Sequence, residues 1–211
     1  MKRRTRGIIL ILLGLVMVFS GTGIYGAYAY QEDIAGENAE LLLEDLRTEM
    51  QTRHEAAIYD PVQEEQPTED LPRLTLSGYD LIGILCVPSL GLELPVLNEW
   101  SYDLLQISPC RYSGSAEEGD LILLGHNYKR HFTPLKQLQP GDTVEFVDVT
   151  GKTYTYTVAI TEILQKTELD RLTTSDYPLT LFTCTNGVYS RFVVRCSLAE
   201  PTTDTSQSQV L

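Results

Sequence analysis

Short runs of β-branched, aromatic and leucine residues fill the second half of the sequence and constrain its fold most strongly. Gly, Pro, Asn or Asp separate the runs, as is typical of strands joined by tight turns. So many strands in so short a stretch must hide their edges, which predicts a closed, mainly β barrel of about 7–8 strands with short helices. Only TPLKQL and SYDLLQI have a helical pattern. The predicted strands are LIGILCVP, LELPVL, DLILLGH, TVEFVDV, KTYTYTVAITEIL, LTLFTC and RFVVRCSL.

Residues 1–30 form a separate segment, in which four basic residues precede an uncharged run from Gly7 to Tyr30. As a helix this run would reach roughly 36 Å, enough to cross a bilayer core of about 30 Å. The basic flank predicts a single-pass anchor in the cell membrane, with the N-terminus in the cytoplasm and the remaining chain extracellular. A cleaved signal peptide is the alternative, because Ala27-Tyr28-Ala29 has the pattern of a cleavage site. The length of the segment favours the anchor.

Residues 31–72 carry 13 acidic side chains against Arg47 and Arg53. This charge excludes a nucleic-acid partner and is typical of a solvated spacer. Residues 37–55 predict an exposed helix, and the Pro- and Glu-rich residues 60–72 predict an extended linker. The barrel domain is then expected over 73–198 and a disordered tail over 199–211. We therefore expect the spacer to be dispensable for the chemistry of the barrel.

Four cysteines, Cys86, Cys110, Cys184 and Cys196, raise the question of disulfides, metal binding and catalysis. Two disulfides are open to them, but a domain of this size can bury its core without any. No metal site is expected, because there is no Cys-x-x-Cys pair and the chain has only three histidines. Cys86 and Cys196 lie inside apolar runs, where a small buried side chain is expected.

Strand alternation distinguishes Cys184 from the other cysteines. Cys184 ends its run and precedes the turn signal Asn186-Gly187, so a hairpin would place it opposite Arg191, with about 5 Å between the Cβ atoms. A guanidinium there favours the thiolate form of the cysteine. Arg195 shares the face of Arg191 and is expected to be an exposed position with a weak surface ion pair. The core face of the same run carries Phe192, Val194, Cys196 and Leu198.

His126 is the candidate proton acceptor for this cysteine. Leu121 to Leu124 predict a fully buried strand, and the Gly125-His126-Asn127 that follows places an imidazole at the end of the sheet. His131, in the charged YKRHF, is expected to be an exposed loop residue, and His54 lies in the acidic spacer. The predicted pair is therefore Cys184 and His126.

These features together resemble one family. LTLFTC, with Arg191 seven residues after the cysteine and Gly-His about 58 residues before it, resembles the sortases, the cysteine transpeptidases of Gram-positive cell surfaces. The resemblance continues through IGILCVPSLGLELPVL and FTPLKQLQPGDTVEFVDVTGKTYTYTV and covers residues 79–198. The class stays open, because pilin-polymerising members have TPYG after the cysteine and a second, C-terminal span, whereas Gly125-His126-Asn127 is closer to class B-like members.

The resemblance implies a sortase barrel in which Cys184 attacks the Thr-Gly bond of an LPXTG-like sorting signal. An amine from peptidoglycan or from another surface protein would then resolve the acyl-enzyme. His126 would act as general acid and base, and Arg191 would hold the substrate and stabilise the oxyanion. Thr183 and Asn127 are the candidate substrate-binding residues. The implied partners are surface proteins or pilins with a sorting signal and the cell membrane; no cofactor is implied, and a calcium requirement stays open.

Two other functions fit parts of the sequence. An L,D-transpeptidase is also an exported, β-rich cysteine acyltransferase, but its motif places a serine and a glycine just before the cysteine, and LFTCTNG lacks that order. A non-enzymatic, membrane-tethered β-domain is the second alternative. An inert Cys184 thiol would distinguish it from an enzyme.

Overall fold

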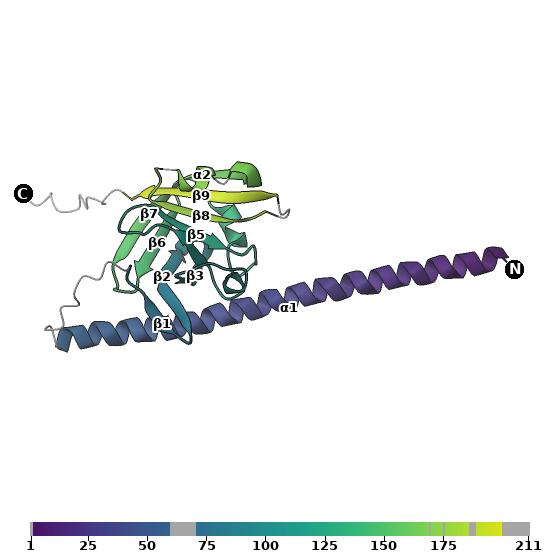
Figure 1. Cartoon of the computed structure of the whole chain (residues 1–211), viewed down its shortest axis with the longest axis horizontal. Coiled ribbons are helices and arrows are strands. Elements are labelled where there is room, and N and C mark those ends of the chain that lie inside the picture. Colours follow the sequence, from purple (N-terminus) through teal and green to yellow (C-terminus); the bar gives the residue numbers. More distant parts are fainter. Residues whose placement is uncertain (1, 60–70, 169, 175, 186–188, 200–211) are drawn as a thin grey trace, which may run out of the picture.

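Eight strands close into a barrel, and a ninth strand extends one edge. The strand order is β1-β2-β3-β4-β5-β8-β9-β7-β6, and β2 also pairs with β6, which closes the barrel. The computed structural model describes residues 2–59, 71–168, 170–174, 176–185 and 189–199. It confirms the closed β-barrel predicted from the sequence (Figure 1). The strands are β1 (Leu74–Leu76), β2 (Tyr79–Val87), β3 (Leu92–Leu97), β4 (Cys110–Ser113), β5 (Leu121–Gly125), β6 (Thr143–Asp148), β7 (Thr153–Gln165), β8 (Leu179–Cys184) and β9 (Ser190–Leu198).

The helices other than the first are short. Both segments with a helical pattern form 3-10 turns, η2 and η3, whereas η1, η4 and α2 had no clear signal in the sequence. The connection from β7 to β8 contains η4 and α2 and lies over the outer face of the barrel (Figure 1). The helices are α1 (Lys2–Tyr59), η1 (Pro88–Leu90), η2 (Leu104–Gln106), η3 (Thr133–Gln137), η4 (Lys166–Glu168) and α2 (Asp170–Thr173).

The β6–β7 hairpin closes through the predicted tight turn. The side chain of Asp148 accepts hydrogen bonds from the backbone N–H groups of Thr150, at 2.8 Å, and Lys152, at 3.0 Å. Gly151 has φ +89°, a left-handed conformation that favours glycine. The turn sets the register in which Val147 pairs with Thr153 and Thr143 with Thr157. A side-chain cap and one glycine therefore define this edge of the barrel.

The apolar residues divide into two clusters because side chains alternate across the barrel wall. The interior cluster includes Leu179 and Leu181 of β8 and Val194 and Cys196 of β9. The outer cluster takes the intervening residues Phe182 and Val193. The middle of β9 is thus buried on both faces. Of the four residues expected on the core face, Leu198 is exposed, at 62%.

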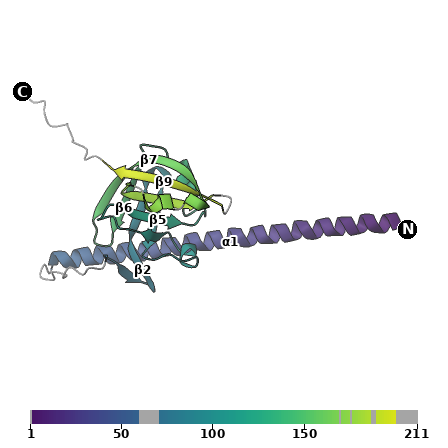
Figure 2. The ribbon, with the colours of Figure 1, turned by 45° about the horizontal axis from the view of Figure 1, so that its top comes forward.

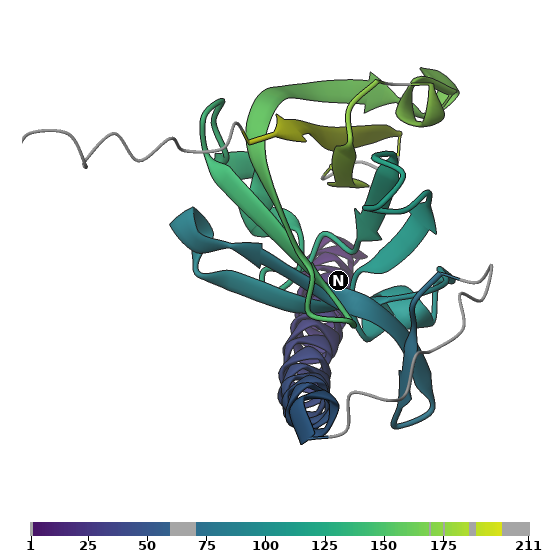
Figure 3. The ribbon, with the colours of Figure 1, turned by 90° about the vertical axis from the view of Figure 1, so that its left-hand side faces the viewer.

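Helix α1 runs along the outside of the barrel and covers part of the outer cluster (Figures 2 and 3). Its residues Leu42, Leu43 and Leu46 pack with Leu74 of β1 and Leu97 of β3. Leu46 is fully buried. The expectation of an exposed spacer helix is therefore wrong for this face, because α1 is amphipathic here and its leucines face the barrel.

The N-terminal half of α1 extends away from the barrel (Figure 1). Its apolar side chains between Ile8 and Phe19 are exposed. In the described part of the chain, α1 is the helix that is long and apolar enough to cross a membrane. The helix continues without interruption from this apolar part into the part that packs on the barrel.

Some predictions fall outside the described residues. They concern most of the extended linker (60–70), the Asn186-Gly187 turn and nearly all of the C-terminal tail (200–211). The strands β1 and β4 are short and were not predicted. Cys110, which had no assigned environment, begins β4 and is buried.

Candidate active site

Strand β8 lies between the two strands that carry the other predicted site residues. It pairs in parallel with β5, where Gly125 aligns with Thr183, and antiparallel with β9, where Cys184 aligns with Arg191. The predicted pairing of Cys184 with Arg191 is therefore confirmed. His126 directly follows Gly125, the last residue of β5, just as Cys184 directly follows the Thr183 with which Gly125 aligns. Three neighbouring strands thus bring His126, Cys184 and Arg191 to one end of the barrel.

Alternation along β8 decides which way each side chain points. Leu181 belongs to the interior cluster and Phe182 to the outer one, so Thr183 points inward and Cys184 outward. Cys184 is half-buried and its thiol is free. Thr183 is fully buried, and its hydroxyl has no hydrogen-bond partner among the described residues. The substrate contact expected of Thr183 is thus on the opposite face of the strand from the thiol.

His126 is held by the loop that follows β5. Its carbonyl oxygen accepts a hydrogen bond from Phe132 N–H at 3.1 Å, so the loop turns back beneath the strand. Gly125 has no room for a side chain, because a Cβ atom there would lie 2.4 Å from the Phe132 ring. The imidazole Nδ1 lies 2.9 Å from the Asn127 side-chain oxygen. Asn127, a predicted substrate contact, therefore orients the histidine in this structure.

The ring of Tyr128 lies flat on the His126 imidazole, with 3.9 Å between centroids and 10° between planes. Burial lowers the pKa of His126 below its usual value, while the hydrogen bond with Asn127 and the charge of Glu32 oppose that change. The neutral imidazole is thus favoured near pH 7. A neutral imidazole can accept a proton from a thiol or an amine.

His131 lies in the same loop but is fully buried, which corrects the expectation of an exposed residue. Its Nε2 lies 3.4 Å from the backbone carbonyl oxygen of Ala35 in α1. Burial lowers the pKa of His131 to about 4, so the side chain is neutral at physiological pH. In the sequence, the adjacent Lys129 and Arg130 suggested that His131 is exposed. In the structure His131 is buried because it packs against α1, some 96 residues earlier in the chain.

Arg191 is half-buried at the start of β9, beside Cys184 of β8 and opposite Leu164 of β7. Its guanidinium donates to the Ser190 carbonyl oxygen at 3.1 Å. The hairpin is closed next to the site by Thr185, whose N–H donates to the Ser190 carbonyl oxygen at 3.1 Å. The arginine is therefore held at the same strand level as the thiol.

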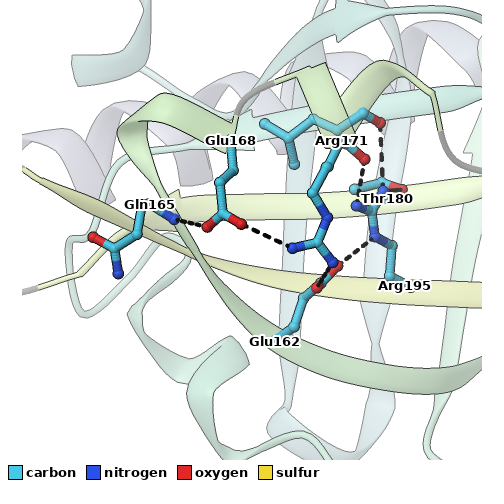
Figure 4. Close-up of polar contacts among 7 residues, drawn as sticks. Glu162, Gln165, Glu168, Arg171, Thr180 and Arg195 are labelled. Carbon is cyan, nitrogen blue, oxygen red and sulfur yellow. Dashed lines mark hydrogen bonds and ion pairs between the residues drawn. The ribbon is translucent and has the colours of Figure 1, made fainter.

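Arg195 is 3% exposed, so the expectation of an exposed strand position is wrong. Figure 4 shows its guanidinium within a polar cluster beneath α2. It pairs with Glu162 at 3.1 Å and donates to the carbonyl oxygens of Arg171, at 2.6 Å, and Leu172, at 3.4 Å. A further hydrogen bond reaches Thr180 Oγ1 at 3.3 Å. These contacts fasten the β7–β8 connection to the barrel.

The other three cysteines differ from Cys184. Cys196 and Cys110 are fully buried, and burial raises the pKa of each thiol to about 12. Burial, with Glu93 nearby, raises the pKa of Cys86 to about 12 as well. All four cysteines are free. A high pKa leaves little thiolate, so these three environments are those of inert thiols.

An aromatic row beside Cys184 had not been predicted. Phe182 shares the outward face of Cys184 and meets the ring of Tyr112 edge-on at 5.3 Å. Trp100 lies 5.8 Å beyond Tyr112 and is 42% exposed. The residues come from three separate parts of the chain, so no local pattern could reveal the row. The row starts at Phe182, two residues before Cys184 on β8, and ends at the exposed ring of Trp100.

Comparison with known proteins identifies the barrel. The sortase domain family matches residues 85–199. A Clostridium perfringens sortase D5 transpeptidase is 19% identical, with 78% of this chain and 97% of that chain covered and a TM-score of 0.54. Clostridium perfringens sortase C, solved with a C-terminal cell wall sorting motif, is 21% identical, with 75% and 89% covered and a TM-score of 0.53.

Sortase C1 from Streptococcus agalactiae is 24% identical, with 73% of this chain and 88% of that chain covered and a TM-score of 0.53. At these identities the solved structures show a common fold. No curated protein matches the chain. No group of three or more His, Cys, Asp and Glu side chains suited to a metal ion lies among the described residues.

Proposed function

The chain belongs to the sortase family, and we propose that it is a membrane-anchored transpeptidase that cleaves an LPXTG-like sorting signal and transfers the acyl part to an amine. The reaction is assigned to Cys184, His126 and Arg191. The observation that supports the proposal is the register of β5, β8 and β9, in which Cys184, with a free thiol, aligns with Arg191, and Gly125, which precedes His126, aligns with Thr183.

In the first half of the reaction, Cys184 attacks the carbonyl carbon of the Thr-Gly bond. The thiol proton passes to the neutral imidazole of His126, and the C–S bond forms. His126 then donates that proton to the nitrogen of the leaving glycine as the C–N bond breaks. The products of this half are a thioester on Cys184 and a peptide with a new amino terminus.

The second half reverses these roles. An acceptor amine attacks the thioester carbon, His126 takes a proton from its nitrogen, and the C–S bond breaks to return the Cys184 thiol. In both halves negative charge develops on the carbonyl oxygen. The planar guanidinium of Arg191 offers fixed donors for that oxyanion, and removing one such donor typically lowers the rate by about 100- to 1000-fold.

The position of the anchor supports a reaction close to the membrane. The end of β8 and the start of β9 face the apolar N-terminal half of α1 (Figure 1). The basic flank of that segment favours a cytoplasmic N-terminus and an extracellular barrel. Surface proteins or pilins with a sorting signal are therefore the proposed substrates, and an amine of peptidoglycan or of another surface protein is the proposed acceptor.

The full chain in detergent micelles, incubated with a library of Leu-Pro-x-Thr-Gly peptides and hydroxylamine, tests this proposal. We expect peptides cut after threonine that carry a hydroxamate, detected by mass spectrometry. Cys184→Ala is the matched control and should yield none. Equal product with Cys184→Ala, or no hydroxamate with any peptide of the library, would contradict the proposal.

A further inference from the structure

Helix α1 contacts the loop that holds His126, at three consecutive points along one face. The ring of Tyr28 meets Tyr128 edge-on, with 5.8 Å between centroids. The Glu32 carboxylate accepts a hydrogen bond from the backbone N–H of Lys129. One turn later, the Ala35 carbonyl oxygen lies 3.4 Å from His131 Nε2.

The spacing of these helix positions explains the contact. Residues 28, 32, 35 and 39 recur every three or four positions, so they share one face of α1. Ala35 and Ala39 are 2% exposed, and their small side chains let the helix approach the loop closely. At Gly36 the helix passes close to the side chain of Arg130, and a Cβ atom there would lie 2.3 Å from Arg130 Cδ, so a larger residue would require that side chain to move. The helix and the loop are thus fitted to each other.

Glu32 is the central contact of this face. It is 6% exposed, although a carboxylate is rarely buried without partners. Among the described residues it contacts two groups of Lys129, the backbone N–H and, at 3.7 Å, the side-chain ammonium. Since the N–H of Lys129 is fixed, the preceding residue Tyr128 is held where its ring covers His126.

Tyr128 transmits this contact to the imidazole. It is 3% exposed, and its ring contacts both Tyr28, edge-on, and His126, face to face. A ring held against the flat side of an imidazole restricts rotation of that imidazole. A chain of ring contacts therefore joins Tyr28 of the helix, through Tyr128 of the loop, to the imidazole of His126.

We propose that Tyr28 and Glu32 of α1 are positioning residues for His126 and act through Tyr128, so that the membrane helix takes part in the reaction as well as anchoring the domain. This inference rests on the proposed role of His126 in proton transfer. It predicts that weakening the contact lowers turnover by misplacing the imidazole, while substrate affinity changes little.

The charges around His126 give the proposal a second readout. Glu32 faces it from α1, Asn127, Tyr128 and His131 belong to its own loop, and Cys184 and Arg191 lie on β8 and β9. The charge of Glu32 favours the protonated imidazole. Glu32→Gln removes that charge and keeps an oxygen acceptor, so it should lower the pKa of His126 further.

The test is NMR of ring-labelled histidine in the full chain in detergent micelles, combined with turnover of a Leu-Pro-x-Thr-Gly peptide. The chain has three histidines, and the exposed His54 serves as an internal reference. In the wild type, the stacked Tyr128 ring should shift the His126 ring protons upfield. Tyr128→Leu and Tyr28→Ala should reduce that shift and lower kcat by about 10- to 100-fold, with KM within about twofold.

Conservative and remote variants serve as controls. Tyr28→Phe and Tyr128→Phe keep the rings and should retain both the shift and kcat within about twofold. Glu40→Gln removes a carboxylate from the same helix, where Glu40 pairs with Arg130 of the same loop at an exposed position. An exposed pair contributes little, so this variant should behave as the wild type does.

Glu32→Gln is nearly isosteric and decides the matter if Tyr128→Leu fails to fold. An unchanged His126 pKa, ring-proton shift and kcat in folded Glu32→Gln and Tyr28→Ala would overturn the proposal. Faster turnover would also overturn it, because the contact would then be inhibitory. If the wild type turns over no peptide, the proposed function fails, while the NMR signals and the rate of Cys184 alkylation by iodoacetamide still decide whether α1 positions His126.

Discussion

Two arginines on the same face of β9 have opposite environments. Arg191 pairs with Cys184 at the open end of the β8–β9 hairpin and is half-buried. Arg195 pairs with Thr180 four residues further along and is 3% exposed, with its guanidinium hydrogen-bonded to Glu162 and to two backbone carbonyls of the β7–β8 connection. Only the first is close to the thiol, since four strand residues span roughly 13 Å.

The difference shows how one strand can serve two purposes. In the buried half of β9, α2 covers the outer face and encloses Arg195. Each N–H donor of its guanidinium then needs a hydrogen-bond acceptor. At its open end, Arg191 keeps access to the surface beside Cys184. The β8–β9 hairpin therefore has a reacting end, with Cys184 and Arg191, and a structural half that includes Thr180, Arg195 and Cys196.

Cys184→Ala should have the largest effect of any change at the reacting end. It removes the nucleophile, so turnover of a sorting peptide should fall to the level without enzyme. The free energy of unfolding, measured by urea titration of the full chain in micelles, should change little, because the side chain is half-buried. Residual turnover in a folded Cys184→Ala protein would show that another residue is the nucleophile.

Arg191→Lys should be the next largest. It keeps the positive charge but loses the planar fork, so turnover should fall by about 100- to 1000-fold, or roughly 3 to 4 kcal/mol. The measurement is kcat/KM for one peptide, with circular dichroism to verify the fold. A larger loss of turnover in folded Arg195→Lys than in Arg191→Lys would contradict the division of the strand.

Arg195→Lys should instead act on stability. A lysine keeps the charge but has three donors and no planar fork, so it cannot satisfy all four acceptors of Arg195, and we expect the free energy of unfolding to fall by about 1 to 3 kcal/mol, the cost of leaving a buried acceptor unsatisfied. Turnover per folded molecule should stay within about tenfold. Unchanged stability would show that the buried network contributes nothing.

Cys196→Ala should have the smallest effect. Cys196 is fully buried in the interior cluster, so losing its sulfur should lower the free energy of unfolding by roughly 1 to 2 kcal/mol. Activity should be retained, because the thiol faces the interior. A loss of turnover comparable to that of Cys184→Ala would mean that the two cysteines act together.

The sequence predicted the reacting end well, because that end depends on local patterns. The bounds of β3 and β8 agree with the apolar runs, and alternation with a hairpin turn was enough to align Cys184 with Arg191. The strand end at His126 followed from Gly125 and the buried run before it. Each inference needed only residues close in the chain.

The remaining features depend on contacts between distant segments. Arg195 was expected to be exposed because its side chain is charged. Its charge is instead paired with Glu162, which is 33 residues away in the sequence. His131 is buried against Ala35 of α1, although Lys129 and Arg130 precede it. For α1 the many acidic residues led to the prediction of an exposed helix. The buried row of Ala35, Ala39 and Leu42 packs on the barrel instead. Composition described the charge of that segment correctly but gave no information about which face was covered.

The central claim is that Cys184 forms the acyl-enzyme, and intact-protein mass spectrometry tests it most directly. The full chain would be mixed with a Leu-Pro-x-Thr-Gly peptide without an added amine, quenched with acid and then digested to locate the adduct. We expect a mass increase equal to the peptide up to its threonine less one water, as a thioester requires, carried by Cys184. An adduct on Cys86, Cys110 or Cys196, or a stable disulfide at Cys184 in the active protein, would contradict it.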